Sequence, residues 1–520
     1  MTTPVVAPSR DFVHARRWSS PFAIGLYFAT VKLLLHFLTN GQYGYFRDEL
    51  YYLARGEHLD WGYVDQPPLA PWMARLSRML LGDSLRALRF LPAVAGATKV
   101  LLTGLMVREL GGKRFAALLA CLCVLVAPGY LGIDTLFSVN AFEPVFWMGC
   151  AYCVMCAIHR NDPRYWLWGG LFGGLGVENK HSMLFFGFGI VIGLLLTPAR
   201  RCFANRWFWL AGAAVFLLFF PNLLWQYQHG WATLEVLRNV QRTGKNVVLP
   251  PLDYIAQQWL LLLPLTALVW VAGLWFFFFT REGARFRLLG VAYGVVLGLM
   301  IVLKGKNYYL LPAYPMLFAA GAVLWEQLIQ ARRSLRWLQV ALPLLILAGG
   351  LVMAPLALPV LPIETYLHYQ RALGVRPLRT EVAHTSPLPQ VFADMFGWPE
   401  MVETVAHIYH SFPPAERGQV AILARNFGEA GAIDFFGPRY GLPKAISPHQ
   451  NYYLWGPRDY TGEIMIVLGA DRETSKEYCT RVEEAGTVNH PYATEYYTIF
   501  ICRGLKQPLR EVWPRWKYWN

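Results

Sequence analysis

Two adjacent acidic residues, Asp48 and Glu49, are the sharpest chemical feature of this sequence. They follow directly on a long apolar stretch, where the chain is expected to leave a membrane. A charged side chain beside hydrocarbon is costly unless it has a partner or a function. A carboxylate here could act as general base toward a hydroxyl group or bind a metal ion. An Arg47–Glu49 ion pair that caps a helix explains the same residues equally well.

Two further segments carry polar groups on what we expect to be the same side of the membrane. Residues 61–72 combine prolines and aromatic residues around Gln66, which suits a membrane interface, a sugar face or a plain surface turn. Residues 134–144 end on Glu143, at the start of an apolar stretch. This acid could favour a helix N-terminus, or it could help to bind a metal or an acceptor.

Basic and phenolic groups gather at two other places on this side. Lys180 interrupts two apolar runs within residues 178–181. Residues 304–315 hold Lys304, Lys306 and Tyr309 beside an apolar stretch. Snorkelling lysines and an aromatic belt would explain this block. A clamp for a lipid phosphate would explain it as well, because cations and phenolic donors suit phosphate oxygens.

The elements that must position these residues are membrane helices. Of the 520 residues, 55% are hydrophobic and only 15% are charged, which excludes a disordered chain, a coiled coil and a purely soluble enzyme. We count about eleven apolar stretches long enough to cross the bilayer. They lie near 21–39, 88–107, 114–131, 141–158, 164–178, 181–198, 207–225, 257–280, 286–303, 308–329 and 337–359. The first stretch is too long for a cleavable signal peptide, so none is expected.

The basic residues predict the orientation of these helices. The net charge of +14 is scattered between apolar runs, so it indicates membrane topology and no nucleic-acid partner. Lys and Arg fall in every second connection, near 16–17, 108–114, 160–164, 200–206, 281–287 and 332–336. Connections rich in Lys and Arg stay in the cytoplasm, so we predict a cytoplasmic N-terminus. All the polar segments above then lie outside.

The C-terminal part has a different pattern. We divide the chain into a transmembrane domain, residues 1–359, and an extracytoplasmic α/β domain, residues 360–520. Short apolar runs at 420–423, 464–468 and 496–501 predict strands, and helices are expected near 398–410 and 472–485. Cys479 and Cys502 could form a disulfide in an oxidising compartment, but the sequence leaves their pairing open.

Three of these motifs together resemble a known family. The Asp48–Glu49 pair, the Gln-Pro-Pro-Leu run at 66–69 and the lysine–tyrosine block at 304–315 resemble the membrane glycosyltransferases of the C superfamily. The most similar branch is the family 39-type group, which includes protein O-mannosyltransferases and aminoarabinose transferases. The resemblance covers about residues 20–330.

The resemblance implies a polyprenyl-phosphate-linked sugar donor and an inverting hexosyl or pentosyl transfer at the outer face of the cytoplasmic membrane. It implies that Asp48 is the general base, and we predict Asp48 and Glu49 as the catalytic residues. Lys304, Lys306 and Tyr309 match the lysine-containing block of the family and are predicted, with Lys180, to bind the donor phosphate.

Two positions depart from the family pattern. Glu143 replaces an aspartate of the second outer loop, which keeps the charge but changes the reach. Gln66 stands where the aminoarabinose transferases have a lysine. This difference removes one phosphate contact and puts a lipid A substrate in doubt.

Several points stay open at this level. A lipid or solute transporter, a flippase and a non-catalytic scaffold with the same fold are the alternatives. The acceptor could be a protein, a glycolipid or a cell-wall glycan. A divalent cation, Mg²⁺ or Mn²⁺, could be held by Asp48, Glu49 and Glu143, although their spacing is not decisive.

Overall fold

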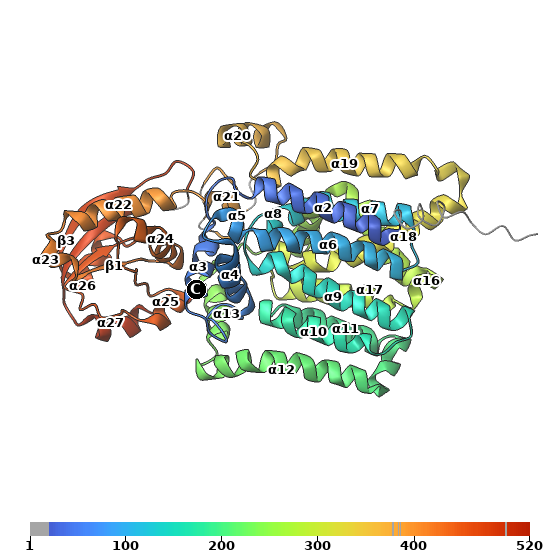
Figure 1. Ribbon diagram of the computed structural model, residues 1–520, viewed down its shortest axis with the longest axis horizontal. Helices are drawn as coiled ribbons and strands as arrows, with labels where there is room; N and C mark the ends of the chain where they lie inside the picture. The colour runs from blue at the N-terminus through green and yellow to red at the C-terminus, as the bar shows by residue number, and fades with distance from the viewer. Residues whose placement is uncertain (1–19, 377–378, 383, 385, 494–496) are drawn as a thin grey trace, which may run out of the picture.

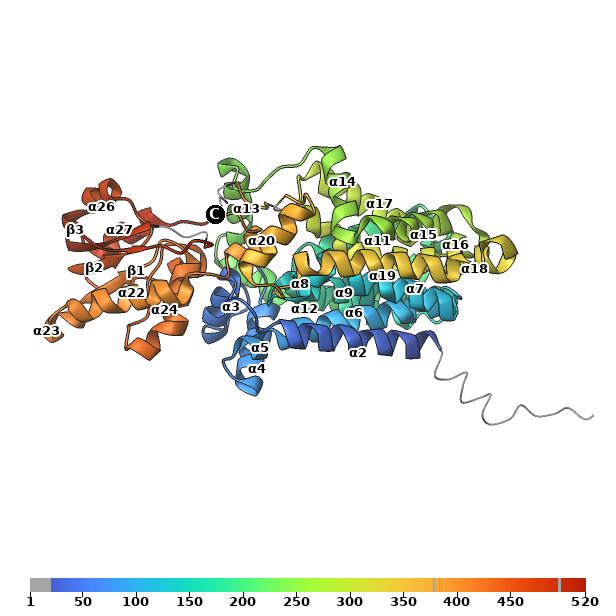
Figure 2. The same cartoon turned by 90° about the horizontal axis from the view of Figure 1, so that it is seen from above.

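A bundle of apolar helices and a smaller sheet-containing part lie end to end (Figures 1 and 2). This computed structural model describes residues 20–376, 379–382, 384, 386–493 and 497–520. The basic residues at 16–17, which contribute to the predicted orientation, lie outside the described residues.

Helices, nearly all of them apolar, build the bundle, which occupies the chain from Pro21 to Ala357. They are α2 (Pro21–Thr39), α6 (Phe90–Glu109), α7 (Arg114–Val126), α8 (Pro128–Asp134), α9 (Val139–His159), α10 (Tyr165–Asn179), α11 (Met183–Leu195), α12 (Arg206–Gln228), α14 (Pro251–Leu262), α15 (Ala267–Phe279), α16 (Arg281–Ala284), α17 (Arg287–Val302), α18 (Tyr314–Ala331) and α19 (Leu338–Ala357). Short 3₁₀ turns join them: η1 (Pro198–Ala204), η2 (Pro264–Thr266), η3 (Asn307–Ala313) and η4 (Arg333–Leu335).

The described residues contain six helices long and apolar enough to cross a membrane, or up to nine if each of three bent helix pairs is one span. The bends of 60°, 106° and 99° separate α7 from α8, α11 from η1 and α14 from η2–α15. Each predicted stretch coincides with one of these helices or pairs, or with the shorter α10 or α17. The class is therefore a polytopic helical membrane protein, while the number of eleven spans stays a prediction.

Small residues allow these helices to approach closely. A Cβ atom on Gly321 of α18 would lie 1.7 Å from the carbonyl oxygen of Val269 on α15, so only glycine fits there. A Cβ atom on Gly104 of α6 would lie 2.8 Å from the carbonyl oxygen of Pro21 at the start of α2. Such contacts replace the hydrophobic driving force, which is missing between helices in lipid.

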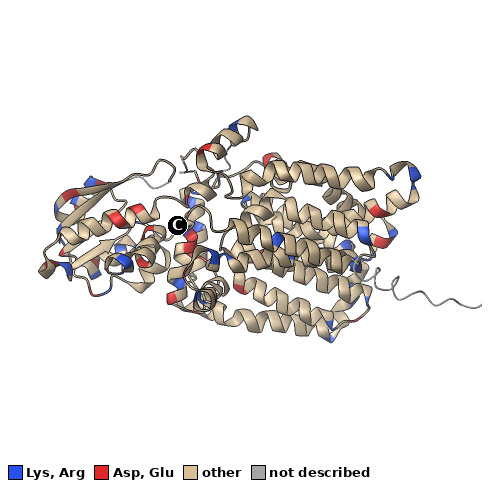
Figure 3. Cartoon of the chain, turned by 45° about the horizontal axis from the view of Figure 1, so that its top comes forward, with Lys and Arg blue, Asp and Glu red and all other residues tan. Residues whose placement is uncertain are grey.

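Four short helices lie between the bundle and the sheet: α3 (Arg47–Glu57), α4 (Leu69–Leu81), α5 (Leu85–Leu88) and α13 (Ala232–Thr243). Most charged residues lie at the two ends of the bundle and in the sheet part, and few lie along the bundle itself (Figure 3). This is the distribution that a membrane-embedded bundle requires.

The C-terminal part contains a four-stranded sheet in the order β1–β2–β4–β3. Its strands are β1 (Val420–Leu423), β2 (Ile464–Val467), β3 (Cys479–Val488) and β4 (Tyr497–Leu505). β1 pairs in parallel with β2, and the other pairs are antiparallel. The helices around it are α20 (Ile363–Ala372), α21 (Gln390–Ala393), α22 (Trp398–Ser411), α23 (Pro414–Arg417), α24 (Phe427–Phe436), α25 (Gln450–Trp455), α26 (Arg472–Tyr478) and α27 (Leu509–Trp516), with the turn η5 (Gly437–Tyr440).

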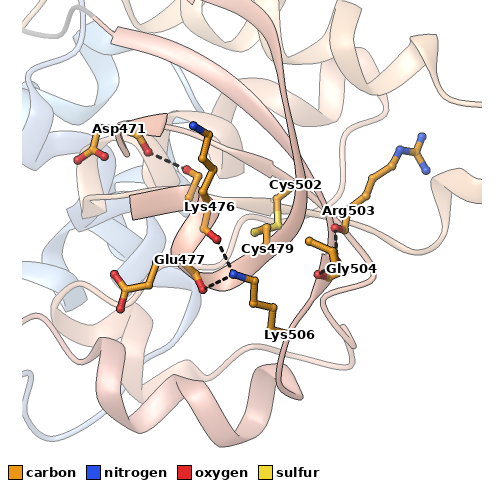
Figure 4. The surroundings of a disulfide bond; sticks show 10 residues. Asp471, Lys476, Glu477, Cys479, Cys502, Arg503, Gly504 and Lys506 are labelled. Carbon is orange, nitrogen blue, oxygen red and sulfur yellow. Dashed lines mark hydrogen bonds between the residues drawn. A yellow bond between two sulfur atoms is a disulfide. The ribbon is translucent and has the colours of Figure 1, made fainter. Parts of the chain in front are cut away.

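One predicted element is wrong in part. The helix expected over 472–485 ends at Tyr478, and the chain continues as strand β3. Residues 479–488 pair along β4, and this pairing outweighs their helical tendency. Cys479 and Cys502 are bonded in the structure, with Cα atoms 5.8 Å apart (Figure 4). The disulfide joins neighbouring strands at this edge of the sheet.

Candidate active site

Helix α3, which carries both acidic residues of the motif, is held between the bundle and the sheet part. Toward the sheet part, the Tyr51 ring stacks on Phe427 of α24 at 4.5 Å, and the Tyr51 hydroxyl donates to Asn451 Oδ1 at 3.1 Å. A Cβ atom on Gly431 of α24 would lie 2.9 Å from the Leu50 backbone, so the two helices touch directly. The position of α3 is therefore set from both sides.

Glu49 is fully buried and its carboxylate is saturated. Both of its oxygens pair with the Arg89 guanidinium at 2.8 Å, and they also accept the backbone N–H groups of Phe46 and Phe137, each at 2.8 Å. Arg89 in turn donates to backbone carbonyls, including Gly44 at 2.8 Å. This geometry favours a positioning role for Glu49 over the catalytic role predicted for it. The alternative Arg47–Glu49 pair is wrong, because Glu49 pairs with Arg89.

Asp48, by contrast, has spare capacity. Its side chain is 38% exposed, and among the described residues its one polar contact is with Arg47 Nε, at 3.5 Å. Arg47 itself is engaged elsewhere, with Glu381 at 3.2 Å and Asp394 at 3.7 Å. Two neighbouring acids of one motif therefore have opposite environments.

A group of cations lies near Asp48. Burial would raise the pKa of Glu381, but the charges of Arg47, Lys245 and Lys306 outweigh it and lower that pKa to about 2. Burial lowers the pKa of Lys245, which also lies within electrostatic reach of Glu381, Lys306 and Asp48. Lys245 Nζ donates to the backbone oxygen of Asn520 at 3.1 Å. Among the described residues, Lys306 Nζ has no hydrogen-bond or ion-pair partner, so it is free to bind an anion.

Three other predicted residues meet at one point. Lys180 Nζ pairs with Glu143 Oε2 at 2.8 Å and lies 3.9 Å from the centre of the Tyr309 ring. Glu143 also accepts the hydroxyl of Ser182. The charges of Asp48 and Glu143 both act on the neighbouring phenol of Tyr308, so this point borders the acidic motif.

Gln66 joins a separate polar group behind α3. Its side chain accepts the Tyr52 hydroxyl at 2.6 Å and donates to Asp65 Oδ2 at 3.1 Å. Asp65 also pairs with the buried Arg55 at 3.0 Å. Burial raises the pKa of Asp65. The negative charge of Asp48 raises this pKa further, whereas the positive charge of Arg55 lowers it. Gln66 therefore orders the segment between α3 and α4, and both its amide oxygen and its amide nitrogen already have partners within the protein.

The structure does not bring Lys304 together with the other predicted residues, and the predicted metal ligands do not converge. The Lys304 side chain is exposed, and within the described part of the chain it makes no hydrogen bond or ion pair with the other site residues. Within the described part of the chain, no group of three or more His, Cys, Asp or Glu side chains could hold a metal ion. Glu49 and Glu143 are each bound to a cation of the protein, so their carboxylates do not converge with Asp48 on one ion.

Known proteins resemble this chain in sequence and in fold. The profile of the family described as dolichyl-phosphate-mannose-protein mannosyltransferase matches residues 65–225. The lipid A galacturonosyltransferase RgtD of Rhizobium johnstonii is 28% identical over 198 residues, which cover 38% of this chain and 41% of that protein. This chain thus aligns with less than half of the length of that curated relative.

Solved structures share the fold over nearly the whole chain. The structure of ArnT from Cupriavidus metallidurans bound to undecaprenyl phosphate matches with a TM-score of 0.59 at 12% identity, covering 91% of this chain and 97% of that one. Its apo structure matches with a TM-score of 0.56. The resemblance to the membrane glycosyltransferases of the C superfamily is confirmed. The chain shares the fold of ArnT, and its apolar helices make it a multi-pass membrane protein.

Several residues around Asp48 and Glu49 belong to none of the sequence motifs that resemble the C superfamily. Lys245 and Glu381 lie far from every motif in the sequence, and Arg89 stands at the start of an apolar stretch as an apparent flanking charge. Only Arg89 carries a sequence signal, since a charged residue that close to hydrocarbon calls for a partner. For Lys245 and Glu381 we find no signal short of the folded structure.

Proposed function

We propose that this protein is an inverting glycosyltransferase. It transfers a sugar from a polyprenyl-phosphate donor to a hydroxyl acceptor at the outer face of the cytoplasmic membrane. The proposal rests chiefly on Asp48, a partly exposed carboxylate whose one ion-pair contact among the described residues is the 3.5 Å approach of Arg47. Asp48 and Lys306 both lie within electrostatic reach of Lys245.

Asp48 is the general base of this proposal. The acceptor hydroxyl gives its proton to the Asp48 carboxylate, while its oxygen forms a bond to the anomeric carbon of the donor. The bond from that carbon to the phosphate oxygen breaks, and its electron pair leaves with polyprenyl phosphate. Attack opposite the leaving group inverts the anomeric centre. Help of this kind is typically worth about 10²–10⁴-fold in rate.

Lys306 and Lys245 are the cations best placed for the leaving group. A phosphate monoester needs positive charge more than it needs a strong acid, because negative charge develops on its oxygens as the bond breaks. Lys306 has no hydrogen-bond or ion-pair partner in the part of the chain that the structure describes, and Lys245 lies within its electrostatic reach. Lys180 is already paired with Glu143, so we propose that it orders the residues around Glu143 and stabilises the Tyr309 ring.

The two named relatives favour particular substrates. RgtD is a lipid A galacturonosyltransferase, and ArnT was solved with undecaprenyl phosphate. We therefore propose an undecaprenyl-type donor and a glycolipid acceptor before a protein or a cell-wall glycan. The Gln66 position argues against simple identity with the aminoarabinose transferases, since its polar atoms are used within the protein.

The orientation of the site follows from the positive charges at the other end of the bundle. Arg108, Arg160 and their neighbours lie there, beside the end of α6. Basic connections face the cytoplasm. We propose that the end of the bundle that carries α3, and the sheet part with its disulfide, face outward into an oxidising compartment.

The test is release of polyprenyl phosphate from a panel of polyprenyl-phosphate sugars by the purified chain in nanodiscs, with and without a lipid A acceptor. Asp48→Asn is the catalytic control and Glu109→Gln the matched control at the far end of the bundle. Release that needs Asp48 supports both the donor class and the base. Release that persists in Asp48→Asn refutes the base. Absence of release with every donor and acceptor favours the scaffold or the transporter.

A further inference from the structure

A buried charged cluster lies inside the bundle, away from the residues proposed for the reaction. Lys32 of α2, Lys99 of α6 and Asp134 at the end of α8 are all fully buried. Lys32 Nζ lies 3.1 Å from Asp134 Oδ2, and Lys99 pairs with Asp134 Oδ1. Gly96 leaves room for this carboxylate, since a Cβ atom there would lie 2.7 Å from Asp134 Oδ2.

This cluster is expensive to keep. It contains two ammonium groups for one carboxylate, in a part of the protein surrounded by apolar helices. Charges in a membrane interior are retained where they have a function, and a buried ion pair seldom adds stability over apolar packing. The cluster therefore calls for a role other than stability.

The cluster holds both ends of the connection between α8 and α9. Lys99 pairs with Asp134, which precedes this connection, and its Nζ also donates to the carbonyl oxygen of Ala141 beyond it, at 3.4 Å. Lys32 adds a second anchor at Asp134. Residues 135–140 are thus clamped between two points that α2 and α6 set.

The clamped connection in turn holds helix α3. The Phe137 N–H donates to Glu49 Oε1 at 2.8 Å, and the Val139 N–H donates to the Tyr52 hydroxyl at 3.3 Å. Glu49 and Tyr52 lie on the same helix as Asp48, and Glu49 follows it directly. A shift of the connection must therefore displace the helix that carries Asp48.

We propose that Lys32, Lys99 and Asp134 are positioning residues, which fix the site of Asp48 through the Phe137–Glu49 and Val139–Tyr52 contacts. They touch no substrate. Their effect on rate rests on the proposed function, whereas their effect on the position of α3 does not. A misplacement of reacting groups by about 1 Å can cost about 10²-fold in rate.

The experiment measures hydrogen exchange of backbone amides in the full chain in nanodiscs, together with transfer kinetics. Asp134→Asn should raise the exchange rate of the Phe137 and Val139 amides at least about tenfold. It should also lower kcat about 10²-fold and change the KM of the donor less than about threefold. In a double-mutant cycle with Glu49→Gln, the two losses of kcat should be less than multiplicative, because both break the same chain of contacts.

Glu326→Gln is the matched control. Glu326 is another buried carboxylate of the bundle, and it accepts the backbone N–H groups of Lys113 at 2.6 Å and Ala116 at 3.1 Å near the far end. Its variant should leave the Phe137 and Val139 amides and kcat unchanged at a comparable loss of thermal stability. If Asp134→Asn does not fold, Lys32→Met takes its place, because it leaves a neutral Lys99–Asp134 pair, and the same changes are expected at smaller size.

Unchanged exchange at Phe137 and Val139, equal effects of Glu326→Gln, or fully multiplicative losses would each overturn the proposal. The exchange measurement does not require activity. Absence of sugar transfer by the unmodified chain would therefore refute the proposed function alone, and protected amides in Asp134→Asn would refute the positioning role alone.

Discussion

Helix α6 connects two charged regions whose acidic side chains differ in how completely they are paired. At its far end, Glu109 is nearly buried and is saturated by Arg108 at 3.1 Å, Arg160 at 2.5 Å and His159 at 3.2 Å. At its beginning, Arg89 saturates Glu49 in the same manner, but Asp48 next to it keeps an oxygen without a close partner.

The difference shows at which end of the bundle charged groups are incompletely paired. At the far end the buried Glu109 and Glu326 both serve the structure, and Glu326 accepts two backbone N–H groups. The near end holds Asp48, whose only ion-pair contact among the described residues is the long one to Arg47. It also holds Lys306, which has no partner within that part of the chain, and both charges act on Lys245. Perturbed or incompletely paired charges of this kind mark functional sites more often than structural ones.

Breaking the acid at each end gives the largest expected contrast. Asp48→Asn should lower kcat about 10²–10⁴-fold while the protein stays folded, because it removes the base and weakens only the 3.5 Å contact with Arg47. Glu109→Gln should lower thermal stability and leave kcat of the folded protein unchanged. Steady-state transfer and a thermal unfolding curve for both variants provide the measurement. A similar fall of kcat in both variants would remove the contrast.

Removing one cation at each end sharpens the comparison with a smaller effect. Lys306→Ala should raise the KM of the donor about tenfold and change kcat less, because a charge-assisted contact to phosphate is worth about 1.5–3 kcal/mol. Arg160→Met at the far end should leave the KM of the donor unchanged. Donor titrations at a fixed acceptor concentration measure both. An unchanged KM in Lys306→Ala would contradict the phosphate role.

The smallest expected effect concerns the sheet part that covers the near end. Burial, with the charges of Lys245 and Arg47, lowers the pKa of His449 to about 3, below its ordinary value. The unfolded chain then binds a proton that the folded chain does not, so stability falls as pH drops below 6.5. Between pH 6.5 and pH 5 the loss is about 2 kcal/mol.

His449→Gln should remove this part of the pH dependence, which thermal unfolding at pH 5 and pH 7 measures. Asp434 has the opposite sign, because burial raises its pKa to about 6 and its contribution grows as pH falls. The comparison is therefore between variant and unmodified chain at each pH. Equal pH dependence in both would show that His449 does not titrate in this way.

Much of the fold could be predicted from local patterns of hydrophobic residues in the sequence. Long apolar runs coincide with the helices of the bundle, and the run at 420–423 coincides with β1. The helix expected over 472–485 failed after Tyr478, because cross-strand pairing with β4 decides that segment. A run of residues shows the spacing of its hydrophobic positions, but it does not show which strand it will pair with.

The sequence alone determined the class of protein and predicted the motif that we propose carries the chemistry. Composition required a membrane bundle, and the adjacent acids with the lysine–tyrosine block pointed to one outer surface. Only the tertiary structure decided which of Asp48 and Glu49 is free and which is bound, and brought Lys245 and Glu381 to the motif. The physical reason is that the availability of a carboxylate depends on partners such as Arg89 and Phe137, which lie 40 and 88 residues away along the chain.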